Sequence, residues 1–134
     1  MEYLCQVWLP SKQLDATLSP AEKQAIDRDS MAYDDELERG GHLIVAQALQ
    51  PVSAAVTVRV RNGKLSTTDG PFAETKEQLG GFILIEARDL NEAIQLAAKI
   101  PLARYGSIEV RPIMKISPQG NPIGTFGRQK NPKL

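Results

Sequence analysis

Two helix-start signals, each lying between strand-like segments, constrain the fold of this chain more than any other sequence feature. The first is SPAE at residues 19–22, in which Ser19 can cap the helix, the proline suits the first turn and Glu22 completes a capping box. We expect this helix to reach about Arg39 and to end at the glycine pair 40–41. The second signal is DLNE at residues 89–92, where Asp89 is the cap and Glu92 again completes a capping box.

The two helices differ in surface. The apolar stripe of the first is Ala25 or Ile26, followed by Tyr33 and Leu37, and its acidic residues are expected on a solvated outer face. Those acidic residues are Asp27, Asp34, Asp35, Glu36 and Glu38. The second helix has a stripe of leucine, isoleucine and alanine suited to close packing, and Pro101 is expected to stop it.

Strand patterns occupy residues 3–9, 42–49, 55–61, 82–87 and 107–113. In 55–61, valine alternates with threonine and arginine, and Asn62-Gly63 follows, the strongest local signal for a two-residue type I′ hairpin. Such a turn pairs Arg61 with Lys64, and each valine with a residue further along the second strand, as far as Val56 with Asp69.

The order of elements predicts an α+β fold, a ferredoxin-like βαββαβ sandwich with an inserted β-hairpin. Both helices would then cover one face of an antiparallel sheet. The other face would carry apolar side chains from strands 3–9 and 82–87 without a cover, so we expect a homodimer that packs sheet on sheet.

Composition narrows the class of protein. The 134 residues fit one domain, and 16 basic against 16 acidic side chains give no overall basic field, which argues against direct nucleic-acid binding. No apolar run approaches the ~20 residues that span a bilayer, so no membrane association is expected. The N-terminal residues do not resemble a secretory signal, and the single cysteine, Cys5, excludes an internal disulfide; a cytoplasmic location is therefore expected.

The last twenty residues differ from the rest. Residues 115–134 hold four basic side chains and no acidic one, whereas residues 1–114 hold 12 basic and 16 acidic. This basic extension is rich in glycine and proline and shows no strand or helix period. Two interpretations stay open, a frayed terminus or an extension that lies across an acidic surface with Ile123 and Phe126 as its anchors.

The segment DGPFAETKEQLGGF at residues 69–82 combines glycines, a proline and clustered charges, and it begins with Asp-Gly-Pro-Phe. It closely resembles the signature of the YCII-related proteins, in particular the subgroup named for that motif, and the similarity extends over about residues 1–113. The resemblance implies a ferredoxin-like, dimeric α/β-barrel domain over 1–114, with the basic extension outside it. The family's activity is largely unassigned; one branch is linked to a His-Asp pair, and some members occur beside extracytoplasmic-function sigma factors.

Two residues are candidates for catalysis. Asp69 either closes an Asx-type turn or points into a cleft as a general base or ligand anchor. His42, the only histidine, opens a strand and either lies on the surface or serves as the acid partner. His42 and Cys5 have no metal-ligand spacing, so no metal is expected. No phosphate loop or dinucleotide fingerprint is present, so no cofactor is expected.

Four further residues are candidates for ligand binding. Lys76 and Glu77 either belong to a solvated loop or bind a polar ligand beside the glycines at 80–81. Phe72 is interpreted as a plug in the core or in a cleft wall. Arg59 shares a hairpin face with Arg61 and either holds an anion, pairs with Glu86 or Glu109, or is solvated.

Two functions remain open at this stage, beside the possibility that the 69–82 segment is purely structural and fixes the dimer. The first is a small enzyme or ligand binder without a tightly held cofactor, with its site near the 69–82 segment, Asp69 and His42 as base and acid, and Lys76 or Arg59 stabilising negative charge. The alternative is a non-catalytic regulatory or interaction module with a protein partner in sigma-factor-linked transcription.

Overall fold

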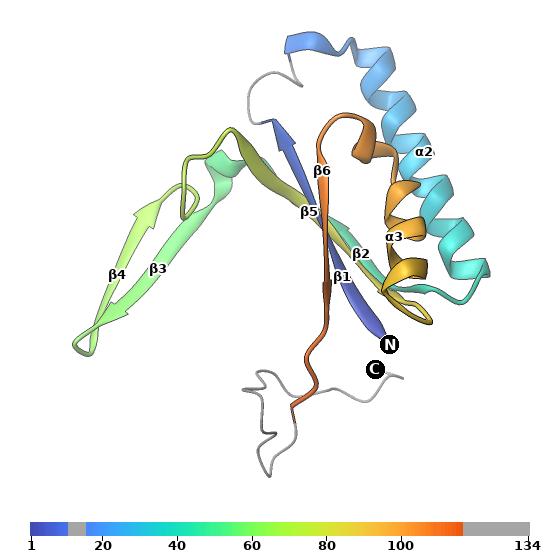
Figure 1. Ribbon diagram of the computed structural model, residues 1–134. Helices are drawn as coiled ribbons and strands as arrows, with labels where there is room; N and C mark the ends of the chain where they lie inside the picture. The colour runs from blue at the N-terminus through green and yellow to red at the C-terminus, as the bar shows by residue number, and fades with distance from the viewer. Residues whose placement is uncertain (11–15, 117–134) are drawn as a thin grey trace.

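The computed structural model describes residues 1–10 and 16–116 (Figure 1). A four-stranded antiparallel sheet has the order β2-β5-β1-β6 and consists of β1 (Glu2–Pro10), β2 (Leu43–Ala48), β5 (Glu77–Glu86) and β6 (Ser107–Pro112). Helices α2 (Pro20–Arg39) and α3 (Leu90–Ala98) lie together on one side of this sheet. The arrangement is α+β and compatible with the ferredoxin-like fold predicted from the sequence.

Both helices begin where the sequence predicts. The Ser19 side chain accepts a hydrogen bond from the Glu22 N–H at 3.1 Å, and the Glu22 carboxylate accepts one from the Ser19 N–H at 3.1 Å, so the first capping box is complete. Asp89 caps α3 by accepting from the Glu92 N–H at 2.8 Å. The second capping box is not formed, because the Glu92 carboxylate accepts instead from the N–H of Arg88 at 2.9 Å.

The core lies between the sheet and the helices. Alternate residues of β1 and β5 point into it, and Tyr33 and Leu37 of α2 pack against them. Ile26 of α2 is buried as well, as the helical stripe predicts. Alanines of α3 allow that helix to approach closely. Cys5 is completely buried, and burial raises the pKa of its thiol to about 11, so it packs as a small apolar side chain.

The predicted hairpin is confirmed in its turn and in its register. Strands β3 (Val56–Arg61) and β4 (Lys64–Asp69) form a separate two-stranded sheet, with Arg61 opposite Lys64 and Val56 opposite Asp69. Asn62 and Gly63 both have positive φ, 54° and 73°, which is the backbone of a type I′ turn. In Figure 1 the hairpin projects from the sheet on the side opposite the two helices.

The prediction that the next strand starts only at Phe82, after a loop, is wrong. Strand β5 begins at Glu77, five residues before the expected start at Phe82, and runs through the glycine pair. Glycine is required there because a Cβ on Gly81 would lie 2.7 Å from the carbonyl oxygen of Gln47 on the neighbouring strand. The two glycines therefore mark close strand contact, not the end of a loop.

Two short 3-10 helices were not predicted. The first, η1 (Val52–Ala54), connects β2 to the hairpin. The second, η2 (Pro101–Arg104), follows α3, which ends at Ala98 before the proline, as expected. Most of the basic extension, residues 117–134, lies outside the described residues, including Ile123 and Phe126.

The second face of the main sheet has no layer of described residues over it. It carries half-exposed apolar side chains in the central and β2 strands, and polar side chains toward β6. The apolar ones are Leu4, Trp8, Val45, Phe82 and Leu84. None of the helices among residues 1–10 and 16–116 is long and apolar enough to cross a membrane.

Candidate functional site

A pocket of about 120 Å³ opens between the sheet, helix α2 and the segment η2. Its floor is formed by residues of β1, β2 and β5, and its walls by one face of α2 and by Ile100, Pro101 and Leu102. The lining is mostly apolar, with few polar side chains. This composition is typical of a small-molecule site.

Small residues in neighbouring strands create the space. On the helix-facing side of the sheet, Val7, Gly81 and Ala48 lie side by side across three strands, and Ala46 lies in the next row, beside Ile83. Because glycine and alanine have little or no side chain, they leave space between the sheet and α2 that larger side chains would fill. Two glycines of the 69–82 segment, Gly80 and Gly81, therefore do contribute to a site, through strand β5 to which they belong.

Two polar side chains of α2, Ser30 and Asp34, line the wall of the pocket and are half-buried. They lie four residues apart and so share one face of the helix. Desolvation raises the pKa of the Asp34 carboxyl, and the neighbouring charge of Asp35 raises it further. The pocket thus holds a carboxylate that has lost part of its hydration.

Tyr33 fixes the roof of the pocket. Its hydroxyl donates a hydrogen bond of 2.6 Å to the carbonyl oxygen of Leu96 near the end of α3, and so ties the two helices together. Burial, with smaller contributions from Glu36 and Cys5, raises the pKa of Tyr33 to about 12. The phenol therefore stays protonated at neutral pH, and its hydrogen bond to Leu96 holds α2 to α3 beside the pocket.

Sequence reasoning missed Asp34, which it placed on the solvated face of α2. The helical spacing could have shown that Asp34 lies near the buried side of α2. Ser30 and Asp34 follow Ile26 at steps of four residues, and Asp34 is next to buried Tyr33. A carboxylate at the edge of an apolar stripe is brought toward the core by the helical period.

The structure separates the two predicted catalytic residues within one chain. His42 lies beside Glu86 at the end of β5, whereas Asp69 precedes the loop that enters the same strand at Glu77. The ten residues of β5 span about 30 Å at roughly 3.3 Å per residue. No ligand of ordinary size would contact both side chains of the same chain.

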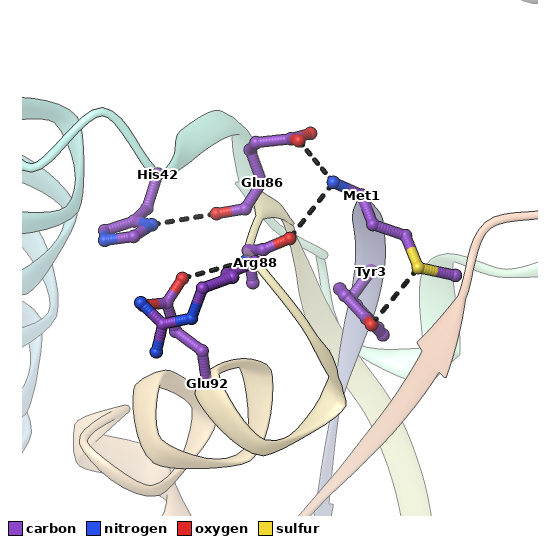
Figure 2. Close-up of polar contacts among 7 residues, drawn as sticks. Met1, Tyr3, His42, Glu86, Arg88 and Glu92 are labelled. Atoms are coloured by element: carbon purple, nitrogen blue, oxygen red, sulfur yellow. Dashed lines mark hydrogen bonds and ion pairs between the residues drawn. The ribbon is translucent and has the colours of Figure 1, made fainter.

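His42 contacts the strand end directly. Its Nδ1 lies 2.8 Å from the carbonyl oxygen of Glu86 and acts as the donor, since a carbonyl only accepts. Figure 2 shows this imidazole beside Glu86, whose carboxylate pairs with the N-terminal ammonium of Met1. The same ammonium donates to the carbonyl of Ala87 at 3.0 Å. These contacts fasten β2 and β1 to the end of β5.

Asp69 is exposed, and its carboxylate accepts no hydrogen bond from the described residues. The predicted Asx-type turn is therefore not formed. The chain reverses instead through Gly70, at φ 104°, whose N–H donates to the Ala55 carbonyl at 2.7 Å and whose carbonyl accepts from the Thr57 hydroxyl at 2.9 Å.

Arg59 and Phe72 are brought together. The guanidinium carbon lies 5.6 Å from the centre of the phenylalanine ring, a cation–π contact. Phe72 is 80% exposed, so the prediction of a core or cleft plug is wrong for the single chain. Of the salt bridges considered for the strand arginines, the one between Arg111 and Glu109 is formed at 3.0 Å, whereas Arg59 pairs with neither Glu86 nor Glu109.

Lys76 and Glu77 lie at the entry to β5. The Glu77 carboxylate accepts a hydrogen bond from the Ser107 hydroxyl at 3.3 Å, which links β5 to the start of β6. Lys76 is exposed in the preceding loop. The Gln78 amide donates to the carbonyls of Ala73 and Thr75 at 3.1 Å each and shapes that loop. These residues do not line the pocket under α2.

Comparison with known proteins shows the family of this chain. A family model for the YCII-related domain matches residues 1–117. The chain belongs to the YCII-related family. An uncharacterized protein of Rhizobium meliloti (strain 1021) is 40% identical over 102 residues, which cover 75% of this chain and 82% of that protein. The name of that relative states no function.

Proposed function

We propose that this YCII-related protein binds a small organic molecule in the pocket beneath α2. The observation that carries the proposal is the half-buried Asp34 carboxylate, which lies in the wall of a mostly apolar cavity. A partly desolvated carboxylate is stabilised by a ligand that donates a hydrogen bond or carries a positive charge. The expected ligand therefore has a compact apolar body and one donor group, preferably a protonated amine.

The size of the cavity limits the ligand. An apolar protein cavity of about 150 Å³ holds one benzene molecule. A pocket of about 120 Å³ would hold a slightly smaller body, such as a five-membered ring, with its polar group directed at Ser30 and Asp34. The raised pKa of Asp34 also suits it to accept and return a proton without a cofactor, so acid–base catalysis on such a ligand is part of the proposal.

The test uses two probes of one shape, cyclopentylamine and cyclopentanecarboxylate, and follows amide chemical shifts of the full chain. We expect the amine to shift residues around the pocket and the carboxylate to shift none of them. Asp34→Asn should abolish the effect of the amine. Asp35→Asn, which removes the same charge one residue away on an exposed position, is the matched control and should keep it. Equal binding of both probes would refute a role for the Asp34 charge.

We further propose that the protein is a homodimer, with the uncovered face of the main sheet against that of a second chain as in a dimeric α/β barrel. The apolar residues of this face support it, because their contact would remove them from water. Light scattering should give about twice 14.7 kDa. The Asp-Gly-Pro-Phe sequence at 69–72 supports membership of the subgroup named for it, and the lone buried Cys5 supports a cytoplasmic location.

The alternative function is a regulatory or interaction module that acts with a protein partner in transcription. The cation–π pair of half-buried Arg59 with exposed Phe72 supports a contact surface on the hairpin and the loop after it more than a closed site. A catalytic pair of Asp69 with His42 would require residues from two chains of the dimer. Full retention of amine binding in Asp69→Asn and His42→Gln would separate the pocket from this second region.

A further inference from the structure

The hairpin of β3 and β4, residues 56–69, stands apart from the rest of the chain, and we refer to it as the β3–β4 arm. It forms its own two-stranded sheet without hydrogen-bonded pairing to the main sheet. In Figure 1 it leaves the domain on the side opposite α2 and α3 and spreads away from the uncovered face of the main sheet. An isolated two-stranded hairpin is marginally stable in water, so an arm of this kind needs a cover.

One face of the arm is mostly apolar and open. Cross-strand pairing places Val56, Val58, Val60 and Leu65 on this face, and these side chains are 58–68% exposed. Thr67 and Asp69 lie on the same face, opposite Val58 and Val56. The opposite face carries threonine, serine and the basic side chains. Alternation of this kind is typical of a hairpin with one buried face, yet no described residue buries it.

We propose that a second copy of this chain covers the valine face of the β3–β4 arm. The inference rests on the homodimer proposed above and names a further part of its interface. In a twofold dimer each arm would lie on the other chain, so both valine faces are buried by one symmetric contact. The arm would then act as a clasp that extends the interface beyond the two main sheets.

Charge supports a second copy as the occupant. The β3–β4 arm contains Arg59, Arg61 and Lys64 against Asp69, a net charge of +2. The remainder of residues 1–114 holds nine basic and fifteen acidic side chains, a net charge of −6. The basic side chains lie on the face opposite the valines, so their attraction steers the arm of one chain toward the body of another, while the valine face makes the contact itself.

Length supports the same occupant. Six residues per strand make the arm about 20 Å long at roughly 3.3 Å per residue. The four strands of the main sheet span about 14–19 Å at roughly 4.8 Å spacing. The arm is thus about as long as a partner's main sheet is wide, which is enough to extend the contact along the partner beyond the sheet-to-sheet interface.

The first experiment measures dimer dissociation of the full chain by sedimentation or light scattering. Val58→Asp puts a charge on the apolar face, whereas Thr68→Asp puts the same charge on the opposite face of the arm. Both positions are exposed in the single chain, so neither change should unfold it. We expect Val58→Asp to raise the dissociation constant at least about tenfold and Thr68→Asp to leave it nearly unchanged, since a charge is costly only where it is buried.

A second measurement tests whether the valine face of the arm is covered in the dimer. Cys5 is fully buried, so a cysteine placed at Val58 or at Thr68 is the only readily labelled thiol. In the dimer, Val58→Cys should react with a maleimide at least about tenfold more slowly than Thr68→Cys, and dilution into monomer should remove the difference.

The outcomes are distinct. A dimer that persists equally in Val58→Asp, with fast labelling of Val58→Cys, overturns the role of the arm and leaves the sheet-to-sheet dimer standing. A wild-type chain that stays monomeric overturns both. Neither result bears on amine binding at Asp34, so the ligand proposal is tested separately.

Discussion

Removal of a single hydroxyl, Tyr33→Phe, tests the link between the two helices that form the pocket. The ring stays in place, so no cavity is created and the apolar area buried is nearly unchanged. What is lost is the 2.6 Å hydrogen bond from Tyr33 to the carbonyl of Leu96. That carbonyl keeps a second donor, the N–H of Lys99 at 3.3 Å, so it is not left without a partner.

The expected cost follows from these contacts. A net hydrogen bond contributes about 1 kcal/mol, and the larger penalty for a stranded buried group does not apply. We expect Tyr33→Phe to lower the free energy of unfolding by about 1 kcal/mol, or the melting temperature by roughly 3–5 °C for a domain of this size. Urea unfolding followed by circular dichroism should show a lower midpoint with an unchanged slope.

Tyr3→Phe is the matched control. Tyr3 is as well buried as Tyr33, but its hydroxyl donates only to the sulfur of Met1 at 3.4 Å, a weak acceptor. We expect a loss of less than about 0.5 kcal/mol. Equal losses in the two variants, or no loss in Tyr33→Phe, would refute the reasoning that the Leu96 contact holds α2 to α3.

Four further predictions concern single residues. Asp34→Asn should stabilise the fold at pH 7. Because the pKa of Asp34 is raised in the folded state, the wild type loses stability as the pH rises from the ordinary aspartate pKa through the raised one, and the advantage of the variant should grow over that range. Unfolding curves at several pH values measure this difference, and an advantage that shrinks with rising pH would contradict it. Cys5, with its pKa near 11, should not react with a disulfide reagent at pH 8 until urea unfolds the chain, as absorbance will show. Gly106→Ala should cost more than about 3 kcal/mol in urea unfolding, since its Cβ would lie 2.0 Å from the carbonyl oxygen of Trp8, and a near-native midpoint would contradict this. Gly63→Val should destabilise the arm by roughly 1–2 kcal/mol because of positive φ, seen as faster amide exchange in residues 56–69 alone.

Local interactions account for what could be predicted without the structure. The capping box of Ser19 with Glu22 spans four residues, and the Asn62-Gly63 turn fixes the pairing on both sides of it. The same logic explains the order of strands and helices and hence the ferredoxin-like arrangement. Each of these features depends on neighbours within a few positions, so a single sequence contains the information.

The candidate site could be predicted only in part. The sequence directed attention to the segment at 69–82, and its glycines do line the pocket, but as part of strand β5. Asp34 was assigned to solvent because its neighbours are acidic, and only the position of α2 over Gly81 and Ala48 shows that it is half-buried. His42 and Asp69 were predicted as acid and base from their residue types, His42 being the only histidine, whereas β5 separates them by its whole length.

The sequence by itself determined where the helices begin, which side chains of a strand share a face, and how the hairpin turns, since hydrogen bonding and periodicity act over short stretches of chain. Only the tertiary structure decided that the glycine pair belongs to a central strand, that the small residues of three strands leave a pocket under α2, and that the valine face of the arm is left open. These features depend on distances between segments far apart in sequence, such as the 2.7 Å that would separate a Cβ at Gly81 from Gln47. Such distances are set by how the sheet and helices pack, which no local pattern contains.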